Sequence, residues 1–176
     1  DVKIKQRNLA VLWNLSEYLI NLSNETKVGK KVELDLEEAY ILSRLNSTIK
    51  KSTELLEAYK IDEVITELER FYLELSRGYI QTIRDKVNDD EGKKAVLYTI
   101  KECYIKFLKM FSIVCPFISE TIYQKIKQID DSEEESIQMH EWPKADEKMI
   151  DESLEKEMHI IQESLTAILA EREKAK

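Results

Sequence analysis

The sequence predicts an all-α protein, an irregular antiparallel bundle of four to five long helices. Of its 176 residues, 35% are charged and 43% are apolar, whereas glycine occurs three times and proline twice. So little glycine and proline leaves few turns, and the mixture of charged and apolar residues suits long amphipathic helices. A chain of this length predicts one domain, residues 1–176, and we find no fixed-period repeat.

The first two predicted helices are amphipathic. The first runs from about the chain start to Asn21, and its apolar residues recur at helical spacing: Leu9, Leu12, Trp13, Leu19 and Leu22. A polar stretch, residues 23–33, ends it. The second helix begins near Asp35, a good N-cap, and ends before Asp62. Its predicted inward residues are Leu42, Leu45, Ile49, Leu56 and Tyr59.

The third and fourth predicted helices carry the longest apolar stripes. In the third, Asp62 can act as the N-cap and the helix stops in NDDEG. Its stripe consists of Ile61, Ile65, Leu68, Tyr72, Leu75, Tyr79 and Ile83. The fourth runs from about Lys93 to Val114 and is apolar over more of its circumference, which predicts the most buried helix. Its apolar residues are Val96, Ile100, Cys103, Tyr104, Phe107, Leu108, Phe111 and Val114.

Two shorter elements and a long helix complete the chain. Pro116 opens a fifth helix that runs through Ile126, because proline suits a first helical turn. An acidic loop (residues 130–135) and the extended stretch SIQMHEWP follow. The last helix begins at about Met149, and its predicted inward residues are Ile150, Leu154, Met158, Ile161, Leu165 and Ile168.

The reactive residue types predict neither a catalytic site nor a metal centre. A di-metal carboxylate bundle requires a glutamate three residues before a histidine, and neither His140 nor His159 has one. Cys103 and Cys115 lie in or near one apolar helix, which favours reduced thiols. There is no glycine-rich phosphate loop. We therefore expect no catalytic residue, no metal ligand and no cofactor in this chain. We also expect Trp13, Trp142 and Tyr104 to be core or core-edge residues.

The two ends of the chain and its apolar runs indicate whether it is part of a larger protein and whether it enters a membrane. It begins with Asp1 and ends in AEREKAK without a helix stop signal, so we expect a piece of a larger protein. No apolar run is long enough to cross a bilayer, and no signal peptide precedes the first helix. We expect a soluble, cytoplasmic fragment that does not bind membranes.

Three of the six arginines recur every seventh residue in the third predicted helix. Arg70, Arg77 and Arg84 then lie on one side of an α-helix with a drift of about 20° per heptad, and Gln81 and Asn88 fall near the same line. Guanidinium groups bind phosphates and stack on unpaired bases, so this face is a candidate RNA-binding surface.

Two other interpretations stay open. The arginines could pair with Glu67 or Glu74, as on the exterior of many charged bundles. The net charge of −8 argues against general nucleic-acid binding, although a local basic patch escapes that objection. An acidic helical bundle that binds a partner protein fits the charge equally well.

Five stretches of the sequence occur in this order: LWNLSEYL, AYILSRLNSTI, ELERFYLELSRGYIQTIRD, CPFISETIY and SIQMHEWP. In this order they resemble the anticodon-binding domain of the class I aminoacyl-tRNA synthetases for large aliphatic amino acids. SIQMHEWPKADEKMIDESLEKEM, followed by AEREKAK, is most similar to the isoleucyl branch. The valyl and leucyl branches stay open.

The resemblance implies a helical anticodon-binding domain, residues 1–176, which recognises the anticodon stem-loop of a tRNA, most specifically isoleucine tRNA. The full-length parent would be an ATP- and magnesium-dependent ligase, and neither of its ATP-handling signatures occurs here, so this fragment alone is not expected to catalyse. Its partners would be tRNA and the remainder of the synthetase, and we expect a monomer. The candidate tRNA-binding residues are Arg70, Arg77, Gln81, Arg84, Lys86 and Asn88.

Several positions depart from the family pattern or have two interpretations. Tyr40 and Gly78 stand where tryptophan is common, Ile113 where a first proline is usual and Gln138 where histidine is frequent. A glycine in mid-helix costs about 1 kcal/mol relative to alanine, so Gly78 indicates a close helix approach or a space that a neighbour fills. Tyr79 could stack on a base or lie in the core. Lys50 and Lys51, like Lys86, could hold backbone phosphates.

Overall fold

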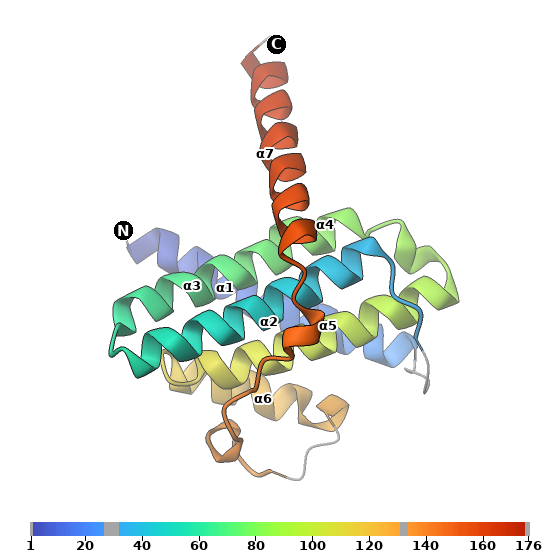
Figure 1. The fold of residues 1–176 in the computed structure, drawn as a ribbon. Coiled ribbons are helices and arrows are strands. Elements are labelled where there is room, and N and C mark those ends of the chain that lie inside the picture. The colour runs from blue at the N-terminus through green and yellow to red at the C-terminus, as the bar shows by residue number, and fades with distance from the viewer. Residues whose placement is uncertain (1, 27–31, 131–133, 175–176) are drawn as a thin grey trace.

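A computed structural model describes residues 2–26, 32–130 and 134–174. Over these ranges the chain is helical and contains no strand, which confirms the all-α prediction (Figure 1). The α-helices are α1 (Val2–Glu25), α2 (Leu36–Glu57), α3 (Ile61–Glu74), α4 (Ile80–Thr82), α5 (Asp90–Phe111), α6 (Pro116–Asp130) and α7 (Glu152–Lys174). A π-helical segment, Leu75–Tyr79, joins α3 to α4, and three 3₁₀ turns cover Lys86–Asn88, Ile137–Met139 and Glu147–Met149.

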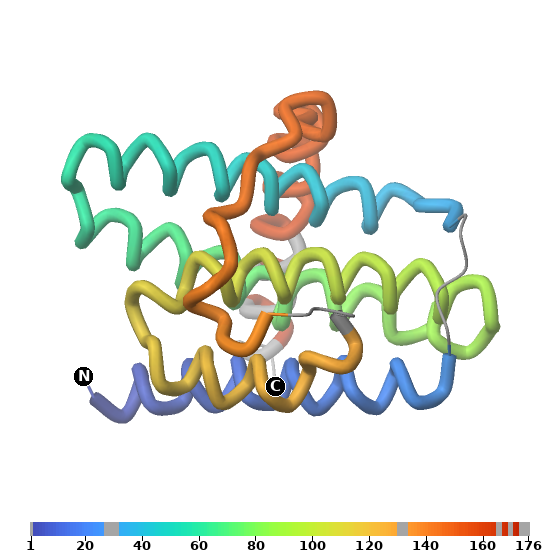
Figure 2. The backbone as a smooth tube through the Cα atoms, turned by 90° about the horizontal axis from the view of Figure 1, so that it is seen from below, coloured from blue at the N-terminus to red at the C-terminus, as the bar shows by residue number. Residues whose placement is uncertain are grey.

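Successive long helices run antiparallel around α5. Figures 1 and 2 show α1, α2, α3, α5 and α6 alternating in direction, and α5 packs against the other four. The centre of the bundle is aromatic: Phe107 stacks on Phe111 with ring centroids 5.1 Å apart, and Tyr72 packs against both rings. The sequence predicts that α5 is the most buried helix because its apolar surface is wide. The structure agrees, since the residues of α5 from Val96 to Phe111 include the largest set of core side chains.

The starts of the helices follow their local sequences in most cases. Asp35 and Glu38 form the capping box of α2, as the sequence predicts for Asp35, and Pro116 opens α6. The prediction for α3 is wrong by two residues: Lys60 is the N-cap and Asp62 lies in the first turn. The apolar stripe is displaced as well, because Val64 is buried whereas Ile61 and Ile65 are exposed.

The segment between α6 and α7 crosses the bundle and is pinned to α2. The indole N–H of Trp142 donates to Oγ1 of Thr53 over 2.9 Å, and the backbone N–H of Asp146 donates to Oδ1 of Asn46 over 2.8 Å. These bonds bring the chain back to α2 before α7 begins. The predicted acidic loop lies partly outside the described residues.

Helix α7 projects away from the bundle instead of packing along it (Figure 1). Leu154 and Met158, near its start, pack against the core as predicted. Ile161 and Ile168 are 57% and 61% exposed, so the prediction that they face inward is wrong, and the predicted side chain of Leu165 lies outside the described part of the structure. The apolar periodicity is real, but no other element of the described chain covers Ile161 or Ile168.

The remaining aromatic and cysteine predictions are largely confirmed. Tyr104 is buried and its hydroxyl donates to the carbonyl oxygen of Leu12 over 2.6 Å. Trp13 differs, since it is 37% exposed and lies under the ammonium group of Lys125. Cys103 is a buried free thiol, and burial raises its pKa. No helix in the described part of the chain is apolar over a length that could span a bilayer.

Candidate nucleic-acid interface

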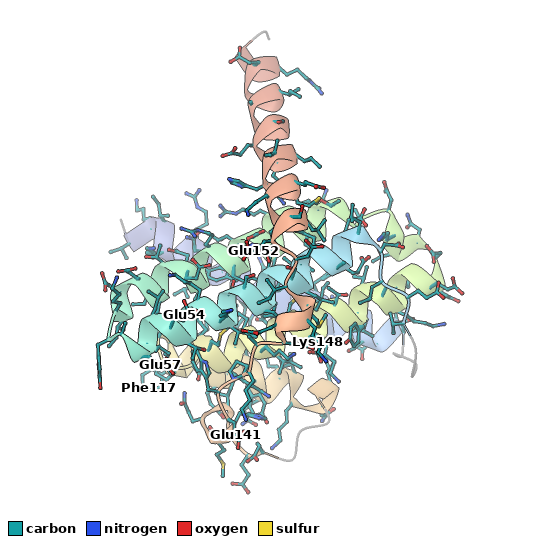
Figure 3. The ribbon with its side chains drawn as sticks, viewed as in Figure 1. Glu54, Glu57, Phe117, Glu141, Lys148 and Glu152 are labelled. Atoms are coloured by element: carbon teal, nitrogen blue, oxygen red, sulfur yellow. The ribbon has the colours of Figure 1, made fainter. Side chains whose placement is uncertain are left out.

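An open groove of about 1370 Å³ lies where α7 leaves the bundle. One wall is the first half of α7, and the other is formed by α3, the π-helical segment and α4. The floor is α2, which contributes Tyr40, Arg44 and Ser47. Figure 3 labels Glu152, which lies at the base of α7 beside the groove.

Three of the six predicted site residues line this groove: Arg70, Arg77 and Gln81. All three are exposed. Arg70 donates to Glu67 on its own helix over 3.0 Å, and the Arg70 side chain is 63% exposed. Nη2 of Arg77 donates to Oδ1 of Asn8 in α1 over 3.3 Å. These contacts leave most of each guanidinium group open to a ligand.

The other three predicted residues lie beyond the groove. Helix α4 ends at Thr82, so Arg84 is in a turn and Lys86 and Asn88 are in a 3₁₀ turn. The heptad count assumed one regular α-helix from residue 62 to residue 88, and the π-helical segment and the early end of α4 both break that regularity. The six residues therefore do not form one continuous face.

Lys86 points into a cluster of carboxylates. Its ammonium nitrogen lies 2.8 Å from Glu38, 2.9 Å from Asp35 and 3.0 Å from Glu37. Burial disfavours the charged form of Lys86, but hydrogen bonds to these carboxylates outweigh burial and raise its pKa. The three carboxylates are close enough together to hold a cation, and the Lys86 ammonium already fills that position.

Sequence patterns did not indicate the residues that the floor and α7 contribute to the groove. Among these are Arg44, Glu155, Lys156, His159 and Gln162. Arg44 stands between the buried residues Leu42 and Leu45, and a charge at the border of an apolar stripe is a signal that could have been used. The groove residues of α7 could not have been predicted from the sequence. Apolar periodicity shows which residues share a face of that helix, but not the direction in which the helix leaves the bundle.

The floor of the groove is an ion-pair network centred on Arg44. Its guanidinium group lies 3.2 Å from Glu74 and 3.0 Å from Glu155, and 3.9 Å from Glu67. The Tyr40 hydroxyl donates to Glu74. Burial, together with this carboxylate, raises the pKa of Tyr40. Arg44 is therefore held in place, in contrast to Arg70 and Arg77 above it.

The charge of the groove differs from that of the chain. Four cationic and three anionic side chains line it, in a chain of net charge −8. Its exposed cationic side chains are Arg70, Arg77 and Lys156, and the exposed Glu152 also lines it. An exposed ion pair contributes little to stability, so its guanidinium can exchange a carboxylate for a phosphate at small cost. The arrangement is suited to binding an anionic ligand.

The other residues that the sequence indicated as possible contacts differ in exposure and in their partners. Tyr79 is 3% exposed and its hydroxyl donates to Glu38 over 2.9 Å, so the core interpretation is confirmed and a stacking role is removed. Lys50 is paired with Glu147 at 3.0 Å, and Lys51 is exposed. At Gly78, an added Cβ would lie 3.4 Å from Nε2 of Gln162 in α7, which confirms that a neighbour occupies this space.

Comparison with known proteins adds sequence relationships to this geometry. The family described as the anticodon-binding domain of tRNA ligase matches residues 38–176. The isoleucine--tRNA ligase of Pyrococcus furiosus is 36% identical over 181 residues, that of Archaeoglobus fulgidus is 36% identical over 177 residues, and each alignment covers 97% of this chain. The isoleucine--tRNA ligase of Methanopyrus kandleri is 31% identical over 187 residues, which cover 99% of this chain. The chain spans about 17% of the length of these relatives.

Proposed function

This chain belongs to the family of anticodon-binding domains of tRNA ligases, and from this premise we propose that it binds the anticodon stem-loop of isoleucine tRNA. The observation that carries the proposal is the alignment of nearly the whole chain with isoleucine--tRNA ligases, at 31–36% identity. The valyl and leucyl alternatives lose support, because the relatives named above are isoleucine enzymes.

The groove between α3 and α7 supplies the contact surface in this proposal. Arg70 and Arg77 bind backbone phosphates or stack on unpaired bases, and the Gln81 amide can hydrogen-bond to a base edge. RNA loops suit such a site because their bases are unstacked and can enter a groove. Arg84 and Asn88 lie beyond the groove and have a smaller part in this proposal.

A local basic surface on an acidic protein favours selectivity over affinity. The charge of −8 repels phosphates in general, so RNA binds only where the arginines outweigh the nearby carboxylates. The larger parent would supply further contacts and hold the tRNA close to this domain. ATP- and magnesium-dependent aminoacylation would take place in the parts of a cytoplasmic, monomeric parent that lie outside this chain.

A binding titration tests the proposal. Fluorescein-labelled isoleucine tRNA transcript is titrated with the chain, and a tRNA for an unrelated amino acid is the specificity control. Arg70→Ala and Arg77→Ala are each expected to weaken binding by about three- to tenfold, as expected for loss of one charge-assisted contact. Lys144→Ala, which removes an exposed charge that does not line the groove, is the matched control.

Two results would contradict the proposal. Equal affinity for both tRNAs would remove the specificity for isoleucine tRNA. Equal loss of affinity in Lys144→Ala and Arg77→Ala would show that the groove is not the binding surface.

A further inference from the structure

The start of α7 is fixed to α2 by its cap. The backbone N–H groups of Ser153 and Leu154 both donate to Oδ1 of Asp151 over 3.0 Å. The backbone N–H of Asp151 itself donates to Oγ of Ser43 in α2 over 2.8 Å. The same residue that caps α7 therefore ties it to the floor of the groove.

One turn further along, Glu155 is held by α2 at three points. Its carboxylate accepts hydrogen bonds from Ser43, from Oγ of Ser47 over 2.7 Å and from Nη1 of Arg44 over 3.0 Å. The Glu155 side chain is 14% exposed. Glu152, one turn before it on the same helix, is 79% exposed and pairs with Lys156 at 3.5 Å.

Arg44 connects the two walls of the groove through one rigid group. Its guanidinium donates from Nε to Glu74 of α3 over 3.2 Å and from Nη1 to Glu155 of α7 over 3.0 Å. A guanidinium group is planar, so the positions of its donors are fixed relative to one another. At this level Arg44 thus bridges α3 and α7, and Ser43 and Ser47 of α2 add contacts to Glu155.

Beyond Glu155, the further contacts of α7 include Met158 against the core and Gln162 beside Gly78. The helix packs mainly on α2, and Ile160, Ile161 and Ile168 are 57–61% exposed. Its 23 residues correspond to a rod of about 34 Å at 1.5 Å per residue. A change of about 10° in its direction would move its far end by about 6 Å on this length.

We propose that Arg44 and Glu155 are positioning residues that fix the direction of α7 and thereby the width of the RNA-binding groove. The consequence for RNA rests on the proposed function, whereas the consequence for the direction of α7 does not. Arg70 and Arg77 then meet the RNA from one wall while Lys156 and His159 meet it from a wall held at a constant distance.

Distances between spin labels measure the direction of α7 without reference to RNA. Labels are attached at Asp62→Cys in α3 and Ile168→Cys in α7, in a Cys115→Ser background, since Cys103 is fully buried. Glu155→Gln removes the charge with little change of shape, and Glu155→Ala removes the contacts. Glu152→Gln is the matched control on the same helix.

The expected result is a shift or broadening of the interlabel distance by several ångströms in Glu155→Ala, because Ile168 lies about 24 Å from the start of α7 and a 10° change moves it by about 4 Å. A smaller effect is expected in Glu155→Gln and none in Glu152→Gln. Affinity for the isoleucine tRNA transcript should fall about three- to tenfold in Glu155→Ala, because RNA must then order α7 on binding. Circular dichroism checks that each variant remains folded.

An unchanged distance distribution in folded Glu155→Ala overturns the proposal. A changed distribution with unchanged RNA affinity also overturns it, because α7 would then not position the groove. If the unmutated chain fails to bind either tRNA, the proposed function fails, and the spin-label distances alone decide whether these two residues fix α7.

Discussion

The ammonium nitrogen of Lys86 lies 2.8 Å from Oε2 of Glu38, whose side chain has no exposed surface. Oε1 of Glu38 accepts the hydroxyl of Tyr79 over 2.9 Å, and Oε2 also accepts the backbone N–H of Asp35 over 3.1 Å in the capping box of α2. This pair joins the start of α2 to the chain segment just before α5. A lysine that looks like a surface cation in the sequence is therefore part of the internal structure.

Loss of Lys86 should destabilise the fold. Lys86→Ala leaves the carboxylates of Asp35, Glu37 and Glu38 close together without their cation, and we expect a loss of about 2 kcal/mol in urea unfolding. Lys50→Ala, which removes a lysine from an exposed pair with Glu147, is the control and should change stability little. Equal effects in the two variants would contradict the internal role of Lys86.

The two described glycines in helical segments should respond differently to alanine. A Cβ at Gly92 would lie 2.2 Å from the backbone oxygen of Lys86, which cannot move aside, so Gly92→Ala should cost roughly 1–3 kcal/mol. At Gly78 the nearest atom is Nε2 of the flexible Gln162 side chain at 3.4 Å, and the higher helix propensity of alanine should offset any crowding. Thermal unfolding of both variants tests the contrast, and a destabilised Gly78→Ala would show that α7 packs there more rigidly than expected.

Acidification should release the stabilisation that Glu120 contributes. Burial raises the pKa of this carboxyl, but hydrogen bonds from Gln124 and from residues 136–137 outweigh burial, and its pKa lies below the ordinary value of 4.5. Because the folded-state pKa is depressed, the stabilisation is present above about pH 4.5 and is lost as the pH falls through the folded pKa.

Urea unfolding of Glu120→Gln measures this contribution. The variant should be less stable than the unmutated chain by about 1 kcal/mol near pH 6, and the difference should shrink towards about pH 3.5. Glu141→Gln, at an exposed glutamate of the segment between α6 and α7, provides the comparison. A difference that stays constant with pH would show that Glu120 acts by packing and not by its charge.

The salt dependence of tRNA binding should distinguish the contribution of the groove arginines from that of Arg84. For the unmutated chain, the logarithm of the tRNA association constant should fall linearly with the logarithm of salt concentration. Arg77→Ala should reduce the slope by about 1, as for one lost phosphate contact. Arg84 lies in a turn beyond the groove, so Arg84→Ala should change slope and affinity less. A larger effect at Arg84 would move the binding surface towards the α4–α5 connection.

Periodicity predicted the helices well, because burial of apolar residues is what selects helical segments here. The stripe from Leu68 to Ile83 is buried and α5 is central, as the sequence indicates. Asp35 and Pro116 marked the starts of α2 and α6 because capping and proline effects are local.

The site was harder to predict, because it depends on breaks in periodicity and on contacts distant in sequence. The π-helical segment at Leu75–Tyr79 gives no strong signal, yet together with the early end of α4 it separates Arg84 from Arg70 and Arg77. The apolar face of α7 predicted burial at Ile161 and Ile168, but periodicity tells which residues share a face and not what covers that face. Arg44 and Glu155 are 111 residues apart, and only the folded chain brings them together.

The hydrogen bond between Trp142 and Thr53 gives the molecule an optical reporter of its own. The chain has two tryptophans, and Trp13→Phe would leave Trp142 as the single indole. Its emission should move to longer wavelength when the connecting segment detaches from α2 and water reaches the ring. Fluorescence would then report when the segment between α6 and α7 detaches from α2. Circular dichroism would report the melting of the helices separately.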